Sequence, residues 1–155
     1  MSEEYDSRPE TYEHIQRVRY YVGQAVDNLR SRAAEHDQSK LVDPELPYWD
    51  VATPRLQTLT YGSEEYRASL KELKPAIEHH YAVNDHHPEF YEQGVRGMSL
   101  MALLEMTCDW KAASERMGAK RSFEDGIAHN QERFGFGDEL ADILRNTARE
   151  LGFDD

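Results

Sequence analysis

Apolar residues recur with a helical period along most of the chain. Near the N-terminus they fall close to the 3.6-residue repeat of an α-helix, at Ile15, Val18, Val22, Val26, Leu29 and Ala33. Ser7 precedes this run as a helix cap, and Pro9 suits the first turn. No run of alternating apolar and polar residues is long enough to predict a strand. The fold class predicted from this pattern is therefore all-α.

Proline and serine punctuate the middle of the chain. Three prolines lie within residues 41–62, and because proline disfavours helix, we expect an irregular segment with one or two short turns there. Ser63, followed by two glutamates, predicts a helix start. This helix is expected to run to about Tyr81 despite Pro75.

The remaining helices follow from apolar stretches and their stop signals. A loop is expected near Asn84, and Pro88 suits the first turn of a short helix. The stretch from Met98 to Met117 predicts a central helix that ends at Gly118. A last amphipathic helix is predicted over about residues 138–151, with one apolar face and Gly152 as its stop. That face consists of Leu140, Ile143, Leu144, Ala148 and Leu151.

Length and charge limit the classes of protein and partner. The chain has 155 residues, which fits a single domain over residues 1–155. It carries 18 lysines and arginines against 30 aspartates and glutamates, a net charge of −12. Because nucleic-acid affinity comes mainly from basic residues, this charge argues against a long nucleic acid as partner. No apolar stretch predicts a membrane span. The oligomeric state is left open, with a homo-oligomer among the alternatives.

Cysteine usage indicates a reducing compartment. Cys108 is the single cysteine, so no intramolecular disulfide can form, and no charged and then apolar leader precedes the first helix. We therefore expect a cytoplasmic protein. Since Cys108 lies inside an apolar stretch, we expect it to be a small buried hydrophobic residue.

Histidines cluster in one short segment. Four of the seven histidines fall within residues 79–87. Neutral imidazole is the commonest metal ligand, so four together favour a metal site over separate structural roles. Neighbouring helical side chains diverge by about 100°, so His79 and His80 cannot both face one cleft from a regular helix. We choose His80 because it lies on the C-terminal side, nearest the loop. The same divergence separates His86 from His87 unless a loop intervenes, and both stay candidates.

A second candidate element is the doublet His36 and Asp37. It offers a nitrogen and an oxygen ligand from consecutive residues, which reach one ion only in a cleft at the end of the helix. Lys40 would face the same cleft and could contact a substrate anion. The alternative for Lys40 is a solvated cation at a helix end.

A third candidate element lies on the predicted central helix. Glu105 and Asp109 are four residues apart and so share one face. A carboxylate on a helix lined with methionine and leucine is costly to bury unless it is paired or bound to metal. Asp109 is therefore a candidate ligand, and Glu105 a residue that orients a ligand histidine or water. Ordinary salt bridges to Lys111 and Arg116 are the alternative.

These residues, with His14 before them, stand in the order found in a known superfamily. The series His14, His36, Asp37 and Asp109 resembles the HD superfamily of metal-dependent phosphohydrolases, and the doublet followed by Lys40 is similar to motifs of several HD branches. More closely, residues 11–117 look like a small phage and bacterial family of unknown function. The resemblance implies an HD-like bundle of about five to seven helices.

The resemblance also implies a ligand set and an activity. One or two divalent ions would be held, the first by His14, His36, Asp37 and Asp109 and the second with help from His80, His86 and His87. The implied activity is hydrolysis of a small phosphorylated substrate such as a nucleotide. In it, Lys40 would hold the phosphate, Asn84 would hydrogen-bond it and Glu105 would orient water or a ligand. Manganese, iron, zinc, cobalt, nickel and magnesium are not distinguished. The alternatives are an HD-fold di-iron oxygenase and a non-catalytic phage-type binding protein.

One feature of the sequence conflicts with this ligand set. If a single helix ran from His14 to His36, the 22 steps between them would span about 33 Å, and they could not share an ion. The apolar period passes through Gly23 almost in phase, which favours a continuous helix. The HD arrangement requires a turn, so we predict a reversal between Gly23 and Leu29. If the helix is straight, His14 leaves the site.

Overall fold

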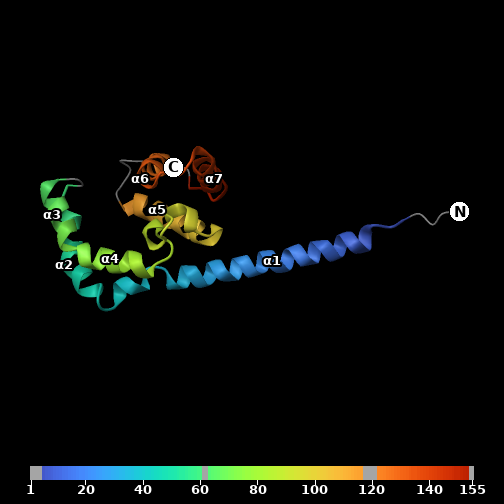
Figure 1. Cartoon of the computed structure of the whole chain (residues 1–155), viewed down its shortest axis with the longest axis horizontal. Helices are drawn as coiled ribbons and strands as arrows, with labels where there is room; N and C mark the ends of the chain where they lie inside the picture. The colour runs from blue at the N-terminus through green and yellow to red at the C-terminus, as the bar shows by residue number, and fades with distance from the viewer. Residues whose placement is uncertain (1–4, 61–62, 117–121, 154–155) are drawn as a thin grey trace. The chain divides into compact units, whose positions relative to one another are not determined.

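The computed structural model describes residues 5–60, 63–116 and 122–153, and within these ranges the fold is all-α (Figure 1). The prediction of fold class is confirmed. The described residues form seven α-helices and three short 3₁₀ helices, with no strand. The chain divides into two units, residues 1–35 and 36–155, and each is described by itself. Among the described helices, none combines the length and the apolar character needed to cross a bilayer.

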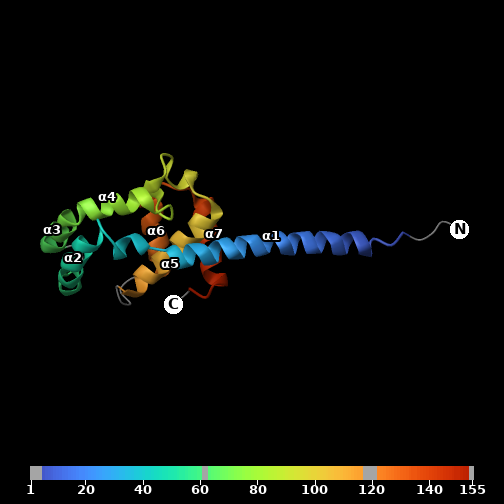
Figure 2. The ribbon, with the colours of Figure 1, turned by 90° about the horizontal axis from the view of Figure 1, so that it is seen from below.

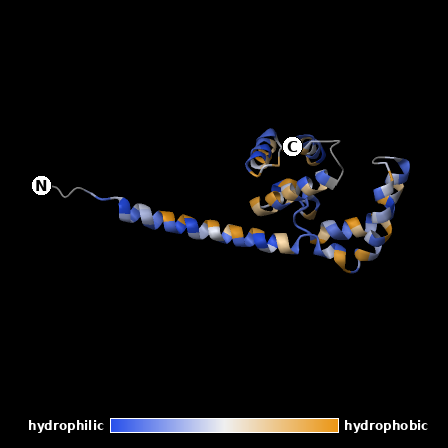
Figure 3. Ribbon diagram, turned by 180° about the vertical axis from the view of Figure 1, so that it is seen from behind, coloured by the Kyte–Doolittle hydropathy of each residue, from blue (hydrophilic) through white to orange (hydrophobic). Residues whose placement is uncertain are grey.

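The first unit contains α1 (Arg8–Glu35), which is one unbroken helix (Figure 2). The predicted reversal between Gly23 and Leu29 is wrong. A glycine inside a helix costs only about 1 kcal/mol, and side chains four apart continue to pair along α1. Gln24 Nε2, for example, donates to the Tyr20 hydroxyl across Gly23 at 3.1 Å. Hydrophobic residues are interspersed among hydrophilic ones along the whole of α1 (Figure 3), and none of the residues of this helix is buried.

The second unit begins with the 3₁₀ helix η1 (Gln38–Leu41) and α2 (Leu46–Thr58). The irregular segment predicted for residues 41–62 is wrong over α2, and residues 61–62 lie outside the described ranges. Pro47 stands in the first turn of α2, where backbone N–H groups have no helical partner, so it does not break the helix. Pro54 is tolerated because α2 buries Ala52 in a cluster with Leu73 and Ala76.

Two helices then replace the single one predicted from Ser63 to Tyr81. The predicted start is confirmed, since Ser63 Oγ accepts a hydrogen bond from Tyr66 N at 3.1 Å and α3 covers Glu64–Glu72. Leu73 ends α3 and begins α4 (Lys74–Val83), with Pro75 in its first turn. The predicted loop at Asn84 and the turn beginning at Pro88 are confirmed, the latter as η2 (Pro88–Phe90). A further 3₁₀ helix, η3 (Gly94–Gly97), leads to the next helix.

The predicted central helix is present as α5 (Leu100–Arg116), while its predicted end at Gly118 lies outside the described residues. The prediction that Cys108 is buried is wrong, because its side chain lies on the exposed side of α5. The sequence pattern missed α6 (Phe123–Phe134). Its first turn carries a capping box between Ser122 and Asp125.

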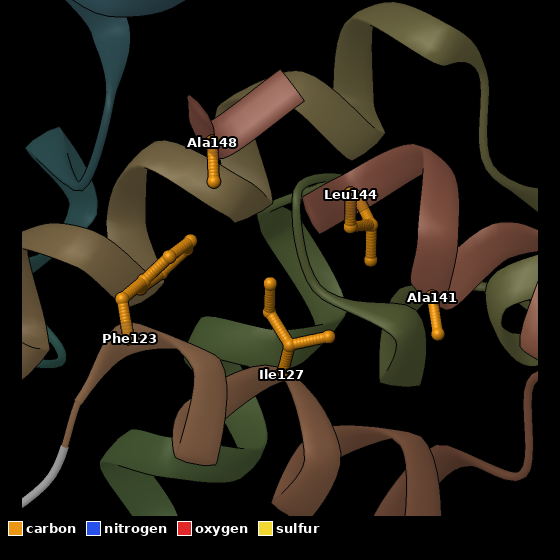
Figure 4. Close-up of a cluster of buried hydrophobic side chains, with 5 residues drawn as sticks. All are labelled: Phe123, Ile127, Ala141, Leu144 and Ala148. Carbon is orange, nitrogen blue, oxygen red and sulfur yellow. The ribbon is translucent and has the colours of Figure 1, made fainter. Parts of the chain in front are cut away.

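The last helix, α7 (Asp138–Glu150), packs on α6, and α6 packs on α5. The core between α6 and α7 is formed by five buried side chains that face one another (Figure 4): Phe123, Ile127, Ala141, Leu144 and Ala148. The predicted apolar face is correct for Leu144 and Ala148, but it is wrong for Ile143 and Leu151, which are 56% and 48% exposed. Gly152, with φ of 70°, terminates the helix as predicted.

Candidate metal centre

The doublet His36 and Asp37 begins the second unit, directly after the last residue of α1. Asp37 has φ of 57°, a left-handed conformation that aspartate tolerates better than most residues. The chain therefore leaves helical geometry at this point. As a result the two neighbouring side chains do not diverge, and His36 Nε2 lies 3.6 Å from Asp37 Oδ2.

The histidine segment supplies three further imidazoles from two kinds of structure. His80 lies on α4 and is 3% exposed, whereas His86 and His87 lie in the loop between α4 and η2. Because a loop intervenes, both of these rings contact that of His80, with centroids 5.9 and 4.9 Å away. The side chain of His79 is 38% exposed, and its Nδ1 atom pairs with Glu45 Oε1 at 2.8 Å. The structure thus places His80, and not His79, beside the other histidines.

The donor atoms of these residues converge. His80 Nε2 lies 3.0 Å from His87 Nε2 and 3.1 Å from Asp37 Oδ1. His86 Nε2 lies 3.4 Å from the same carboxylate oxygen. Asp37 Oδ1 and His86 Nε2 are buried and have no hydrogen-bond partner among the described residues. Buried polar atoms without a partner are costly, and here they point at one another, as ligands of a shared cation do.

A second group of donors shares Asp37 with the first. Asp109, on α5, places Oδ1 3.6 Å from His36 Nε2. The donor atoms of His36, Asp37 and Asp109 lie within 4.8 Å of one another, and so do those of Asp37, His80, His86 and His87. Two adjacent sets of donors, joined through one carboxylate, could therefore hold one or two cations.

Two further carboxylates bind the opposite nitrogens of these rings. Glu105 Oε1 lies 2.8 Å from His36 Nδ1 and 3.2 Å from His86 Nδ1. Glu45 Oε2 lies 3.1 Å from His80 Nδ1. A metal-ligating histidine almost always bonds a carboxylate or carbonyl through its other nitrogen. Glu105, which sequence reasoning assigned to orienting a ligand, occupies such a place, as does Glu45.

Charge at the centre is strongly negative in the absence of a cation. Of Asp37, Asp109 and Glu45, only Asp37 pairs with a lysine among the described residues. Burial alone would raise the pKa of Asp37, but the neighbouring His80, His86 and Lys40 side chains lower it well below its usual range. Burial would likewise raise the pKa of Asp109, yet the ion pair with His36 lowers it. Both groups are carboxylates at neutral pH and therefore suit a cation.

The imidazoles differ in their protonation. The neighbouring Asp109 carboxylate raises the pKa of His36 to about 9; burial opposes this shift and Glu105 adds to it. Burial, together with the nearby rings of His86 and His80, lowers the pKa of His87 to about 3. At neutral pH, His87 therefore has a free lone pair, whereas His36 must lose a proton before it can bind a metal.

Lys40 and Asn84 lie at the edge of the donor groups. Lys40 Nζ donates to Asp37 Oδ2 at 2.5 Å and lies 5.2 Å from the centre of the Trp49 ring. The amide nitrogen of Asn84 lies 2.9 Å from Ser39 Oγ and 2.8 Å from the backbone oxygen of His80. Asn84 thus holds the end of α4 in place. The substrate contact expected of it stays a prediction.

Comparison with known proteins gives one match. The model of DUF5662, described as a family of unknown function, matches residues 3–150. The chain belongs to DUF5662. No curated protein and no solved structure matches it.

One predicted ligand does not reach the centre of this DUF5662 protein. His14 lies in unbroken α1, 21 residues before Glu35, which corresponds to about 32 Å along the helix axis. It cannot share an ion with His36, the next residue after that helix. The expectation that His14 is a ligand is therefore wrong, because the required turn is absent.

The sequence pattern also gave no prediction for Glu45, a residue beside the donor groups of this DUF5662 protein. Glu45 is fully buried and contacts two histidines of the predicted cluster. It was overlooked because the prolines around it predicted an irregular segment. The available signal was weak: a glutamate directly before Leu46 and Pro47, where a helix could begin and bury its first turn.

Proposed function

We propose that this protein is a metal-dependent phosphohydrolase that acts on a small phosphorylated substrate such as a nucleotide. The observation that supports this most strongly is the close approach of His80 Nε2 to both His87 Nε2 and Asp37 Oδ1, at 3.0 and 3.1 Å. Two imidazole nitrogens at that distance repel one another unless a proton or a cation lies between them. The part of the HD-like order that remains without His14, the doublet His36 and Asp37 followed by Lys40 and later by Asp109, supports the choice of hydrolysis.

The donor set suits a first-row transition metal. Four imidazoles and two carboxylates belong to the two connected groups. Imidazole suits zinc, iron and nickel, carboxylate oxygens suit manganese, and magnesium prefers an all-oxygen set. A divalent cation held there would lower the pKa of a bound water and polarise a phosphoryl oxygen.

The protein's own residues supply the rest of the chemistry. Lys40 is only partly exposed and is fixed between Asp37 and the Trp49 ring, so its ammonium presents a positive charge to a phosphate group. Glu105 holds His36 and His86 by their Nδ1 atoms and so directs both Nε2 atoms toward Asp37. Because the chain has a net charge of −12, a small substrate suits it better than a polynucleotide. We place this activity in the cytoplasm.

The test is release of inorganic phosphate from nucleotides and p-nitrophenyl phosphate by protein loaded with manganese, cobalt or nickel. We expect release by the wild type and none by Asp37→Asn. Lys40→Met should keep its metal and lose about 100-fold in kcat/KM, since it removes charge stabilisation of the transition state.

Full metal occupancy without any phosphate release would contradict the hydrolase. In that case, iron with visible absorption bands and oxygen consumption would favour the di-iron oxygenase. A nucleotide recovered unchanged in complex with the protein would instead favour the binding protein.

A further inference from the structure

Glu45 belongs to neither of the two donor groups joined through Asp37, yet it is a fully buried carboxylate beside them. Its Oε1 lies 2.8 Å from His79 Nδ1, and its Oε2 lies 3.1 Å from His80 Nδ1 and 3.3 Å from Trp49 Nε1. No lysine or arginine of the described residues pairs with it. A buried carboxylate is costly unless its partners carry positive charge or donate hydrogen bonds. Glu45 therefore depends on hydrogen bonds from these rings.

A carboxylate oxygen lies beside each nitrogen of the His80 ring. Asn84 has two amide hydrogens, and the acceptors Ser39 Oγ and the backbone oxygen of His80 take both, so none is left for His80 Nδ1, 3.0 Å away. Ser39 Oγ lies 3.2 Å from His80 Nδ1, but a bare Nδ1 would still face Glu45 Oε2 at 3.1 Å and be repelled. A cation beside Nε2, which faces Asp37 Oδ1 at 3.1 Å, would take the lone pair of Nε2 and leave the hydrogen on Nδ1, where Glu45 accepts it.

Glu45 repeats the arrangement seen at Glu105. Each carboxylate accepts from the Nδ1 atoms of two imidazoles, Glu105 from His36 and His86 and Glu45 from His79 and His80. In three of these four rings, the Nε2 atom points to the Asp37 carboxylate. The exception is His79, the more exposed ring, which covers Glu45 and takes no part in the donor groups.

Glu45 also reaches Lys40 indirectly. The Trp49 indole N–H donates to Glu45, and Lys40 lies over the same ring. Removing the acceptor would therefore free the ring against which Lys40 packs.

We propose that Glu45 is a positioning residue that holds His80 in the Nδ1–H tautomer, so that Nε2 faces the cation, and that holds Trp49 beneath Lys40. This inference rests on the proposed metal-dependent function. It adds a residue from outside the motifs that carried the family resemblance.

The experiment is a zinc titration of the complete chain, by calorimetry and by long-range ¹⁵N–¹H correlation spectra of histidine-labelled protein. In the wild type with zinc bound we expect the hydrogen of His80 on Nδ1 and a shift of its Nε2 resonance. Glu45→Leu removes both acceptor oxygens and should weaken zinc binding about 10- to 100-fold. Glu45→Gln keeps one acceptor oxygen, so its affinity for zinc should lie between that of the wild type and that of Glu45→Leu. The matched control is Glu78→Gln, an exposed glutamate on α4, which should bind zinc like the wild type.

The outcomes separate this inference from the function on which it rests. Zinc binding by Glu45→Leu as tight as that of the wild type would overturn the positioning role and leave the metal centre standing. So would a spectrum of the zinc-loaded wild type in which His80 binds zinc through Nδ1 and carries its hydrogen on Nε2, a result that needs no variant to fold. A wild type that binds no zinc would contradict the metal centre itself.

Discussion

The Nε2 atoms of His80 and His87 lie 3.0 Å apart, although one residue belongs to α4 and the other to the loop that follows it. The low pKa of His87, about 3, follows from burial and from the neighbouring imidazoles, and it means that this ring is neutral at physiological pH. A neutral ring so close to another imidazole and to the Asp37 carboxylate provides a lone pair for a cation. The arrangement therefore suits a metal ion. It disfavours a second proton on the His87 ring at neutral pH.

Asp37 joins both donor groups, so its carboxylate should decide metal occupancy. We expect Asp37→Asn to lose most of the bound metal, measured by mass spectrometry of protein loaded with zinc and then desalted. Asparagine tolerates the left-handed conformation of this residue, so the change removes charge without adding backbone strain. Asp50→Asn, on the exposed side of α2, is the control and should retain its metal. Equal metal in Asp37→Asn and wild type would show that the ions bind elsewhere.

His14 provides the opposite test. Because about 32 Å of unbroken helix separates it from the end of α1, His14→Ala should leave metal content and affinity unchanged. The same metal measurement checks this. A loss of metal comparable to that of Asp37→Asn would mean that α1 bends in solution and that the straight helix is not the functional form.

The HD resemblance, and not the residue pattern, led to the wrong expectation at His14. Apolar residues continue in phase through Gly23, and that local signal correctly favours a single helix. Signals of this kind, which depend on neighbouring residues, also gave the cap at Ser63 and the loop that lets His86 and His87 face one site. Most of the residues that the sequence predicted to lie together do so in the structure, because they stand beside such signals.

Features that depend on packing between distant segments could not be predicted. Helix α2 exists because Ala52 is buried against Leu73 and Ala76, which outweighs the cost of Pro54. Glu45 is buried because histidines 34 and 35 residues away donate to it. The first contact has no signature in the surrounding residues, and the second has only the weak one of a glutamate directly before Leu46 and Pro47.

Stability of the metal-free protein should depend on His36 between pH 6.5 and 9. The Asp109 carboxylate raises the pKa of His36 to about 9, above the ordinary value of 6.5. A pKa raised by folding stabilises the folded state fully below pH 6.5, and this contribution is lost as pH rises through 9. We expect the difference in unfolding free energy between wild type and His36→Gln, measured in urea with EDTA, to be larger at pH 6 than at pH 9.5. A difference that grows with pH would contradict the assigned ion pairs.

The core between α6 and α7 should carry much of the local stability. Leu144 is buried among Phe123, Ile127 and Ala141, so Leu144→Ala should lower the unfolding free energy by about 2–4 kcal/mol. Its neighbour Ile143 is exposed, and Ile143→Ala should cost less than about 1 kcal/mol. Urea denaturation of the two variants measures both values. Equal costs would mean that α7 presents a different face to the core.

The central claim, that a divalent cation binds where Asp37, His80 and His87 meet, is tested most directly by anomalous diffraction from crystals of zinc-loaded protein at the zinc absorption edge. We expect an anomalous peak about 2.0–2.2 Å from the Nε2 atoms of His80 and His87 and from Oδ1 of Asp37. A well-ordered centre with no peak between these atoms, or a peak bound only by other residues, would contradict it.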